Sequence, residues 1–426
     1  MQILLFTHYF PPEGNAPASR AYEHCVRWAR AGHDVTVVTS VPNVPDGVAY
    51  PGFENRWQSQ TEFVDGIRVV RVWTYLAPNA GSIKRIANYV SYMLSACRES
   101  TRVQRPDVIV ATTPQFFCGW AGVLASRMCR VPLVLEVRDI WPESIKTVGA
   151  MKNARLLSFL ERLEQWMYRS AAHIVTVGEG YRENILSKAT VANRISVISN
   201  GVDLNRFAPG AKEALFLRKW DLQRKFVCSY VGTLGMAHGL RVVIDAAHLL
   251  RQGGRDDIRF CLVGDGAERC ALEAYARERG VADSVVFTGR QSKEAIPAIL
   301  SSSDASLIHL KKSELFKTVI PSKIFETMAM QRPIIMGVDG EARDIVSQAG
   351  ASLNMEPGCP HSLASAVERL ADYPQLAKRL GQRARNFVSQ FYNRDVLAAQ
   401  YLDLLERVAE NRGTLIQQPD KTLAAA

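Results

Sequence analysis

The sequence lacks the features that mark several specialised classes of protein. Its eight cysteines are scattered without a Cys-x-x-Cys pair, which argues against both a zinc site and a disulfide framework. No apolar run approaches the roughly 18 residues of a membrane span. The start of the chain, MQILLFTHYF, also lacks the basic segment of a signal peptide. We therefore expect a protein of the reduced cytoplasm.

Three signatures of nucleotide or metal binding are missing as well. No Gly-x-Gly-x-x-Gly follows the first predicted strand, which argues against a nicotinamide-binding fingerprint, and there is no Walker phosphate loop. The sequence also contains no Asp-x-Asp, which is consistent with chemistry that needs no metal. We expect no metal ion and no cofactor.

The composition that remains is typical of a globular protein with a basic surface. The 426 residues are enough for two domains, and 47% hydrophobic with 22% charged residues is an ordinary proportion. The net charge of +10 indicates an anionic partner, such as a nucleotide, a phosphorylated substrate, an anionic lipid or nucleic acid.

The first half alternates short apolar runs with helical stretches, the pattern of a doubly wound α/β domain. The first strand leads into a stiff loop, residues 8–14, that contains two prolines and ends in Glu13 and Gly14. Loops at the carboxyl ends of parallel strands are where such sheets bind ligands. The predicted strands are residues 3–7, 35–39, 67–73, 108–111, 133–137, 174–177 and 195–198.

Residues 83–105 form a basic amphipathic stretch. From Arg68 to Arg105 the chain has seven basic residues and one acidic residue, Glu99, and apolar residues recur at helical spacing. A helix of this kind can lie on an anionic membrane surface. It can equally pack on the sheet like any helix of an α/β domain, and the sequence leaves both interpretations open.

A cluster of charge comes after the predicted strand 133–137. Arg138, Asp139 and Glu143 stand just beyond that strand, at the edge where ligands are expected. They are candidates for contacts to a ligand. An ion pair between Arg138 and Asp139 that only fixes the loop is an equal alternative.

The second half resumes with a strand, residues 226–231, a glycine-rich turn and a helix predicted over residues 240–252. The turn contains Gly232, Gly235 and His238. Backbone N–H groups in such a turn can approach phosphate oxygens closely, so the segment predicts a phosphate cradle. Later strands end in similar loops, which contain Gly264 and Arg290. From the pattern alone, Asp265 and Arg290 are ordinary turn residues.

The most informative stretch is residues 311–337. A helix should begin at Pro321-Ser322, because proline suits a first turn and serine is a good N-terminal cap. Lys323 then lies in the first turn, where the helix dipole disfavours a cation unless a phosphate is bound there. Glu326, one turn further on, could accept hydrogen bonds from a ribose diol. An ordinary amphipathic helix with a surface Lys and Glu explains the local pattern equally well.

This stretch resembles the acidic-motif helix of the family 4 (group 1) retaining glycosyltransferases of the GT-B fold. Glu326 matches the second acid of that motif, and residues 328–334, MAMQRPI, match the end of the motif. The first acid would fall at Thr318, so half of the motif is missing. The preceding Pro-Ser-Lys is similar to a subgroup, typified by N-acetylfucosaminyl transferases, that builds bacterial surface polysaccharides. Residues 200–203, Asn-Gly-Val-Asp, resemble the interdomain linker of the family.

The resemblance implies an α/β chain of two Rossmann-like, doubly wound domains that face a cleft. Residues 1–205 would bind the acceptor and residues 206–390 the nucleotide-sugar donor. A helix at 391–411 would cross back to the first domain, and 412–426 would be a disordered tail. The family's two diphosphate-binding cations correspond to Thr233 and His238, so Lys323 would take more of that burden.

The implied site residues fall into three groups. The catalytic candidates are Lys323, Arg138, Asp139 and Glu143. Arg138 stands where the family commonly has a histidine. The acceptor-side candidates are Glu13 and Gly14. The donor-binding candidates are Glu326, Ser322, Gly232, Gly235, His238, Gly264 and Arg290.

The implied activity is sugar transfer from a nucleoside-diphosphate sugar, with retention. The expected donor is a UDP-sugar such as UDP-N-acetyl-fucosamine or a related amino sugar. The expected acceptor is a saccharide on polyprenyl diphosphate, used for O-antigen, capsule or exopolysaccharide at the anionic inner face of the bacterial plasma membrane, with no role for nucleic acid. Two alternatives stay open. One is a nucleotide-sugar epimerase, which would need Asp139 and Glu143 as an acid/base pair; the other is a non-catalytic carbohydrate- or membrane-binding scaffold.

Overall fold

The computed structural model describes residues 1–411 except 45, 79–81, 114, 142 and 144–152. These residues form two compact units. Unit 1 comprises Met1–Ser199 and the segment from Asp395 onward, and unit 2 comprises Asn200–Arg394. The sequence places the domain boundary near residue 205, whereas the chain enters unit 2 at Asn200. The tail predicted at 412–426 lies outside the described residues.

Unit 1 is built on an eight-stranded sheet in the order β3-β4-β2-β1-β5-β6-β7-β8. Every neighbouring pair is parallel except β3 with β4. The parallel strands therefore end at one edge of the sheet. The strands are β1 Gln2–Phe6, β2 Asp34–Ser40, β3 Gln60–Val64, β4 Ile67–Val72, β5 Val108–Thr112, β6 Leu133–Val137, β7 His173–Thr176 and β8 Ile195–Val197.

Strand β3 was not predicted from the sequence. It pairs antiparallel with β4 through a two-residue turn at Asp65 and Gly66, both of which have positive φ. Asp-Gly is the residue pair that such a hairpin turn favours. Residues of β3 alternate between half-buried and exposed because the strand lies at the sheet edge, so it lacks the apolar run that marked the other strands.

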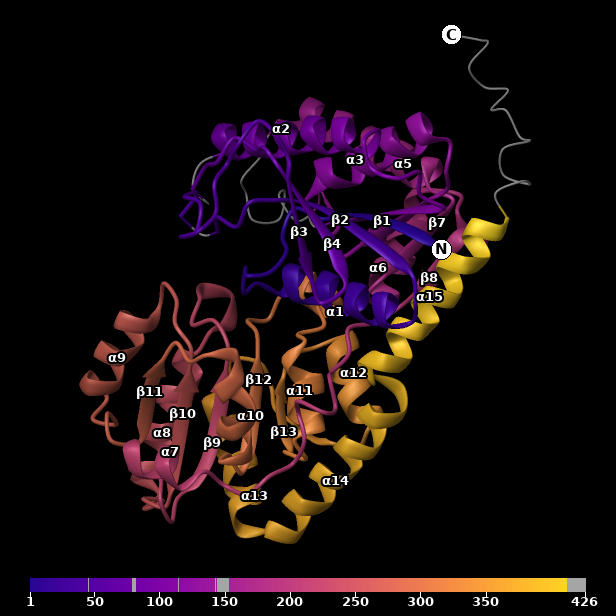
Figure 1. Ribbon diagram of the computed structural model, residues 1–426. Coiled ribbons are helices and arrows are strands. Elements are labelled where there is room, and N and C mark those ends of the chain that lie inside the picture. The colour runs from indigo at the N-terminus through magenta and orange to yellow at the C-terminus, as the bar shows by residue number, and fades with distance from the viewer. Residues whose placement is uncertain (45, 79–81, 114, 142, 144–152, 412–426) are drawn as a thin grey trace. The chain divides into compact units, whose positions relative to one another are not determined.

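Helices cover both faces of this sheet (Figure 1). Successive residues of a strand point to opposite faces of the sheet, and in β1 both sets are apolar. Leu4 and Phe6 pack toward α2, α3 and α5, whereas Ile3 and Leu5 pack toward α1 and α15. The helices are α1 Ala16–Arg30, α2 Ser82–Ser100, α3 Phe116–Cys129, α5 Ala154–Ser170, α6 Glu179–Lys188 and α15 Arg394–Glu410, with a 3-10 turn η1 at Ala192–Arg194.

The last helix, α15, packs into the core of unit 1. Its apolar residues Leu397, Tyr401 and Leu404 belong to the same buried cluster as Trp28 of α1. The Trp28 indole N–H also donates a hydrogen bond to the Ala398 carbonyl at 3.1 Å. The C-terminal segment is thereby fixed to the unit that contains the N-terminus.

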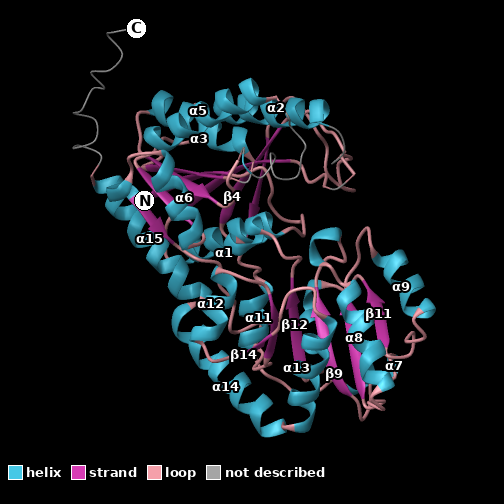
Figure 2. Ribbon diagram, turned by 180° about the vertical axis from the view of Figure 1, so that it is seen from behind, coloured by secondary structure: helices cyan, strands magenta, loops and turns pink. Residues whose placement is uncertain are grey.

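Unit 2 contains a six-stranded parallel sheet in the order β11-β10-β9-β12-β13-β14. Its central strands β9, β12 and β13 are almost fully buried because helices cover both faces of the sheet (Figure 2). The strands are β9 Phe226–Val231, β10 Ile258–Val263, β11 Val285–Gly289, β12 Ala305–His309, β13 Ile334–Gly337 and β14 Ser352–Asn354.

The helices of unit 2 follow the strands in regular alternation, and α8 packs against α13 while α11 packs against α14. The α-helices are α7 Ala214–Lys219, α8 Arg241–Gln252, α9 Arg269–Glu278, α10 Ile296–Ser301, α11 Lys323–Ala329, α12 Glu341–Gln348, α13 Pro360–Asp372 and α14 Pro374–Phe391. Short 3-10 turns are η2 Met236–His238, η3 Lys293–Ala295 and η4 Glu314–Thr318.

The helix predicted after Pro321 is α11, but its capping differs from the prediction. Ser322 occupies the N-cap position with helical backbone angles and makes no side-chain capping hydrogen bond. A serine caps from an extended backbone conformation, so its hydroxyl in the helical conformation does not reach the free N–H groups. Ser322 is exposed.

Candidate functional site

The loops after β9 and β10 lie backbone against backbone in unit 2. A Cβ added to Gly264 would lie 1.9 Å from the Gly232 carbonyl oxygen, and one added to Gly266 would lie 2.5 Å from the Leu234 carbonyl oxygen. The Leu234 N–H donates to the Asp265 carbonyl at 3.0 Å. Only glycine fits these two positions, which have positive φ as well. The close approach fixes the glycine-rich turn predicted to cradle a phosphate.

Lys323 extends from the start of α11 to this turn. Its Nζ lies 3.8 Å from the centroid of the Tyr230 ring and 3.0 Å from where a Cβ of Gly232 would stand. The residue as a whole is partly exposed, but Nζ is buried and, within the described part of the chain, has no hydrogen-bond partner. A buried ammonium without a hydrogen-bonding anion is costly, and the ring face offsets only part of that cost.

Burial lowers the pKa of the Lys323 ammonium from 10.5 to about 7, although the nearby carboxylate of Glu326 opposes the shift. In the unliganded protein the amine is therefore close to half protonated at neutral pH. An anion bound beside Nζ would favour the charged form and restore a higher pKa.

His238 lies in the same turn and also presents an unsatisfied nitrogen. Its Nδ1 is buried without a hydrogen-bond partner among the described residues, and its ring packs edge-on to Tyr230 at 5.8 Å. Burial, with a smaller contribution from the charge of Lys323, lowers the pKa of His238 to about 4. The imidazole is neutral at pH 7, so Lys323 is the residue of this pair that can carry positive charge.

His309, which the sequence analysis did not single out, holds the turn in place. Its Nδ1 lies 2.6 Å from the His238 carbonyl oxygen, and the Gly358 N–H donates to Nε2 at 2.9 Å. Since Nε2 accepts, the proton of this buried imidazole is on Nδ1 and is donated to His238. The sequence signal that could have identified His309 is a histidine at the carboxyl end of an apolar strand, because β12 ends at His309.

The other donor-side candidates lie along the same edge of the unit 2 sheet. Glu326 is half-buried one turn after Lys323 in α11, and Thr318 ends the preceding turn η4. Gly235 caps η2. Arg290 comes directly after the carboxyl end of β11 and is exposed. Together with Gly232 and Gly264, these residues lie in or just after the segments that follow β9, β10, β11 and β12. All of these segments begin at the carboxyl edge of the unit 2 sheet.

In unit 1, Arg138 lies in a buried charge cluster. The Arg20 guanidinium pairs with Glu136 at 2.9 Å, and Arg138 donates to the Pro17 carbonyl at 3.5 Å. Burial alone would raise the pKa of Glu136, but the charges of Arg20 and Arg138 bring it below its usual range. Burial lowers the pKa of Arg138 to about 10 against the opposing charge of Glu136. Glu136 is thus a carboxylate whose charge offsets that of Arg138.

Two other predicted site acids of unit 1, Glu143 and Glu13, form contacts within that unit. Glu143 accepts a hydrogen bond from Asn184 at 2.9 Å and pairs with Lys188 at 2.9 Å. Glu13 is buried, and its Oε1 accepts the N–H groups of Asn43 and Val44 at 2.9 and 3.2 Å. Burial raises the pKa of Glu13 despite these bonds.

Gly14, beside Glu13, is exposed, and Asp139 is half-buried after β6. The structure thus places the predicted unit 1 residues at the carboxyl edge of the sheet, with Glu13 and Glu143 already engaged in fixing loops.

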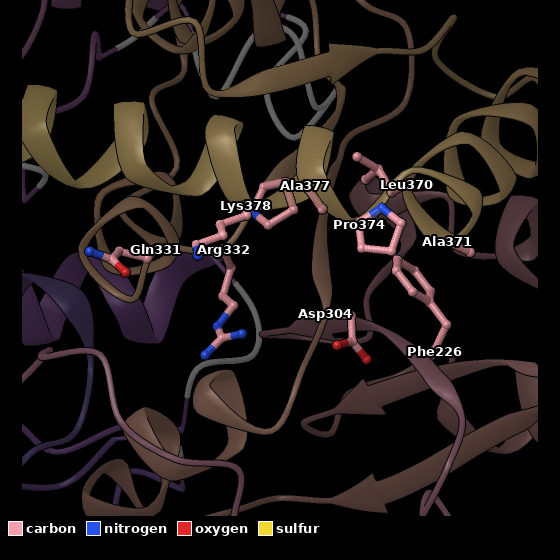
Figure 3. Close-up of a pocket in the computed structure, with 10 residues that line it drawn as sticks. Phe226, Asp304, Gln331, Arg332, Leu370, Ala371, Pro374, Ala377 and Lys378 are labelled. Atoms are coloured by element: carbon pink, nitrogen blue, oxygen red, sulfur yellow. The ribbon is translucent and has the colours of Figure 1, made fainter.

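A surface pocket of about 330 Å³ lies elsewhere in unit 2 (Figure 3). Its residues include Phe226 at the start of β9, Asp304 before β12 and Pro333 before β13. These are amino ends of strands, so the pocket is at the edge opposite to Gly232 and Lys323. Asp304 there pairs with Lys212 at 2.6 Å and accepts the Val227 N–H at 2.9 Å, which indicates a structural role.

Comparison with known proteins identifies both units. Residues 15–201 match the model of the glycosyl transferase 4-like domain, and residues 216–387 match that of glycosyl transferases group 1. The chain is 24% identical over 415 residues to an Escherichia coli K12 protein assigned to colanic acid biosynthesis as a glycosyl transferase, WcaI, with 92% of this chain and 99% of that protein covered. It is 28% identical over 342 residues to the 2-deoxystreptamine glucosyltransferase of Streptomyces kanamyceticus, covering 77% and 84%.

Solved structures agree on the fold. The Anabaena protein Alr3699/HepE in complex with UDP and glucose superposes with a TM-score of 0.70 at 17% identity, covering 96% of this chain and all of that one. Sucrose-phosphate synthase from Thermosynechococcus elongatus superposes with a TM-score of 0.72 at 17% identity, covering 96% and 98%. The expected pair of Rossmann-like domains is confirmed, and the chain belongs to the family 4 (group 1) glycosyltransferases of the GT-B fold.

Proposed function

We propose that unit 2 binds a nucleoside-diphosphate sugar and that the protein transfers this sugar to a lipid-linked saccharide. The observation that carries the proposal is the buried Nζ of Lys323, which has no hydrogen-bond partner among the described residues and faces the glycine turn at Gly232. A diphosphate beside Nζ would supply the missing anion. Backbone N–H groups of the turn would offset the rest of its lost hydration.

The chemistry depends on the charges that such a site can stabilise. The bond between the anomeric carbon and the diphosphate oxygen breaks, and a bond from that carbon to the acceptor oxygen forms. The proton of the acceptor hydroxyl passes to an oxygen of the departing nucleoside diphosphate. Negative charge grows on the departing diphosphate, and a fixed cation such as Lys323 stabilises that charge more in the transition state than in the bound donor. Retention of the anomeric configuration is part of the proposal.

The finer assignment concerns the donor and the acceptor. We infer a UDP-sugar, such as UDP-N-acetyl-fucosamine or a related amino sugar, and an acceptor saccharide on polyprenyl diphosphate. The Pro-Ser-Lys at residues 321–323 supports this subgroup. The match to a protein of colanic acid biosynthesis supports a role in a bacterial surface polysaccharide. The enzyme would then act at the inner face of the plasma membrane.

A donor screen tests the proposal. The purified protein is incubated with UDP-, GDP- and dTDP-sugars in EDTA, with and without a bacterial lipid extract, and the released nucleoside diphosphate and the sugar products are measured. We expect transfer with the extract and slow hydrolysis without it. Conversion of a nucleotide sugar to its epimer without acceptor would indicate an epimerase. No turnover of any donor would favour a non-catalytic scaffold.

The affinity for the donor should depend on pH through Lys323. The pKa of about 7 in the free protein rises when a diphosphate binds, so binding above pH 7 takes up a proton. Affinity should be constant well below pH 7 and fall by up to about tenfold per pH unit above it. Calorimetry with UDP-glucose from pH 6 to 9 measures this, because its diphosphate does not itself titrate in that range. A slope that persists in Lys323→Met would contradict the assignment to Lys323.

A further inference from the structure

Helices α2, α3 and α5 lie side by side over one face of the unit 1 sheet, as both views show (Figures 1 and 2). Their outer side leaves several large apolar side chains exposed, among them Leu94 of α2 at 60%, Met128 of α3 at 54% and Phe159 of α5 at 56%. The complete set, which we call the outer apolar residues, is Ile86, Leu94, Met128, Leu156, Phe159 and Trp166.

The charges on this side are of one sign. Among the described residues of 82–105, 116–130 and 153–170, every exposed charged residue is basic. The acids there are turned inward: Glu164 and Glu99 are buried and Glu161 is half-buried. The exposed basic residues are Lys84, Arg85, Arg98, Arg102, Arg105, Arg127, Arg130, Arg155, Arg162 and Arg169.

Helix α5 shows how the two kinds of residue are arranged. Arg155, Phe159, Arg162, Trp166 and Arg169 follow at spacings of three and four, so they share one side of the helix. Arginine side chains beside aromatic residues on a helix are suited to the boundary between lipid headgroups and acyl chains.

Contacts on the neighbouring helix hold the aromatic anchor of α5 in place. The ring centroids of Trp166 and Trp120 lie 5.0 Å apart, and the Arg127 guanidinium carbon lies 5.1 Å from the centroid of the Trp166 ring. The fold therefore presents Trp166 and Arg127 from two helices as one rigid surface.

The packing interpretation of residues 83–105 is confirmed for the inner side of α2, whereas contact of its outer side with a membrane stays a prediction. On its inner side α2 packs on the sheet through Tyr92, Ala96 and Cys97. On its outer side it presents Leu94 and Arg98, which are four residues apart and both exposed. The outer residues cannot be explained by packing within unit 1, because they are exposed.

We propose that this surface of α2, α3 and α5 docks the protein on an anionic lipid bilayer. The aliphatic side chains favour a bilayer over nucleic acid, because Leu94, Ile86 and Met128 offer no ring on which a base could stack. Insertion is shallow, since no helix built from described residues is long and apolar enough to cross a membrane. The inference goes beyond the proposed function, because it rests on residues outside the donor site.

Vesicle sedimentation of the full-length protein tests the proposal. We expect binding to vesicles containing 30% phosphatidylglycerol in low salt, release in high salt, and little binding to pure phosphatidylcholine. The double variant Arg155→Glu/Arg162→Glu should lower the partition coefficient by at least about 30-fold. The double variant Leu94→Ser/Phe159→Ser should lower it by roughly tenfold while the salt dependence persists.

Matched changes on α14 of unit 2 serve as controls. Lys378→Glu/Arg379→Glu makes the same charge change, and Tyr373→Ser/Phe391→Ser removes two exposed aromatic rings. Both controls should bind vesicles like the unaltered protein, and all variants should keep donor affinity. The proposal fails if the unaltered protein ignores anionic vesicles in low salt, binds nucleic acid in their place, or loses vesicle binding as much through the α14 changes.

Discussion

Replacing Lys323 with methionine is expected to lower the rate constant of sugar transfer by about 100- to 1000-fold. The family's two diphosphate-binding cations are Thr233 and His238 in this chain, and burial keeps His238 neutral at pH 7 with a pKa of about 4. Under the proposed function, stabilisation of the leaving group therefore depends on Lys323, whose Nζ lies beside Gly232. Because charge grows on the diphosphate as the bond breaks, the rate should suffer more than donor affinity.

The variant should also fold at least as well as the unaltered protein. Methionine fills a similar volume, and it removes a buried ammonium whose desolvation is costly. Turnover at saturating donor, donor affinity by calorimetry and thermal unfolding are the three measurements. Lys312→Met is a matched control, because Lys312 is an exposed lysine in the segment before α11 and its Nζ lies 4.0 Å from Glu356. Near-normal turnover in Lys323→Met would mean that the diphosphate is held elsewhere, and Arg138, Lys317 and Arg290 would be tested next.

Replacing Glu326 with alanine is expected to weaken donor binding by about 10- to 100-fold, the worth of one or two hydrogen bonds to a charged acceptor. Glu326 stands one turn after Lys323 and is half-buried, so its carboxylate can face a ribose next to the diphosphate. The change also removes the charge that raises the pKa of Lys323. Calorimetry with UDP-glucose should therefore be done well below pH 7, so that Lys323 is protonated in both the variant and the unaltered protein.

Two comparisons make the Glu326 result specific. Glu326→Gln keeps one acceptor oxygen and should lose less affinity than Glu326→Ala. Glu356→Ala alters an exposed acid of the same unit and should leave affinity unchanged. Equal donor affinity in Glu326→Ala and the unaltered protein would contradict a contact between Glu326 and the ribose.

Much of the candidate donor site could be predicted because its signals are local. The spacing of Lys323 and Glu326 after Pro321, and the glycine turn after β9, are patterns within a few residues of each other. Parallel strands bring such segments to one edge of a sheet, so the predicted residues meet there without further information. The capping role of Ser322 was wrong because the backbone angles at that position depend on the preceding loop.

The parts that could not be predicted depend on contacts distant in sequence. His309 supports the turn through a hydrogen bond to the carbonyl of His238, 71 residues away in the sequence. The sequence of the strand that contains His309 does not predict that partner. The low pKa of Lys323 results from burial against Tyr230, which spacing does not reveal. Glu136 balances the charges of both Arg138 and Arg20, and Arg20 comes from α1, more than 100 residues earlier in the chain.

Hydrogen–deuterium exchange with and without UDP is the most direct test that unit 2 holds the donor. The glycine turn, the loop after β10 and the start of α11 should exchange more slowly when UDP is bound, since their N–H groups and Lys323 would contact the diphosphate. The peptides concerned cover residues 232–239, 264–268 and 323–326. Slower exchange in these peptides is the predicted result. UDP binding that is measurable by calorimetry but protects only peptides of unit 1 would contradict the account.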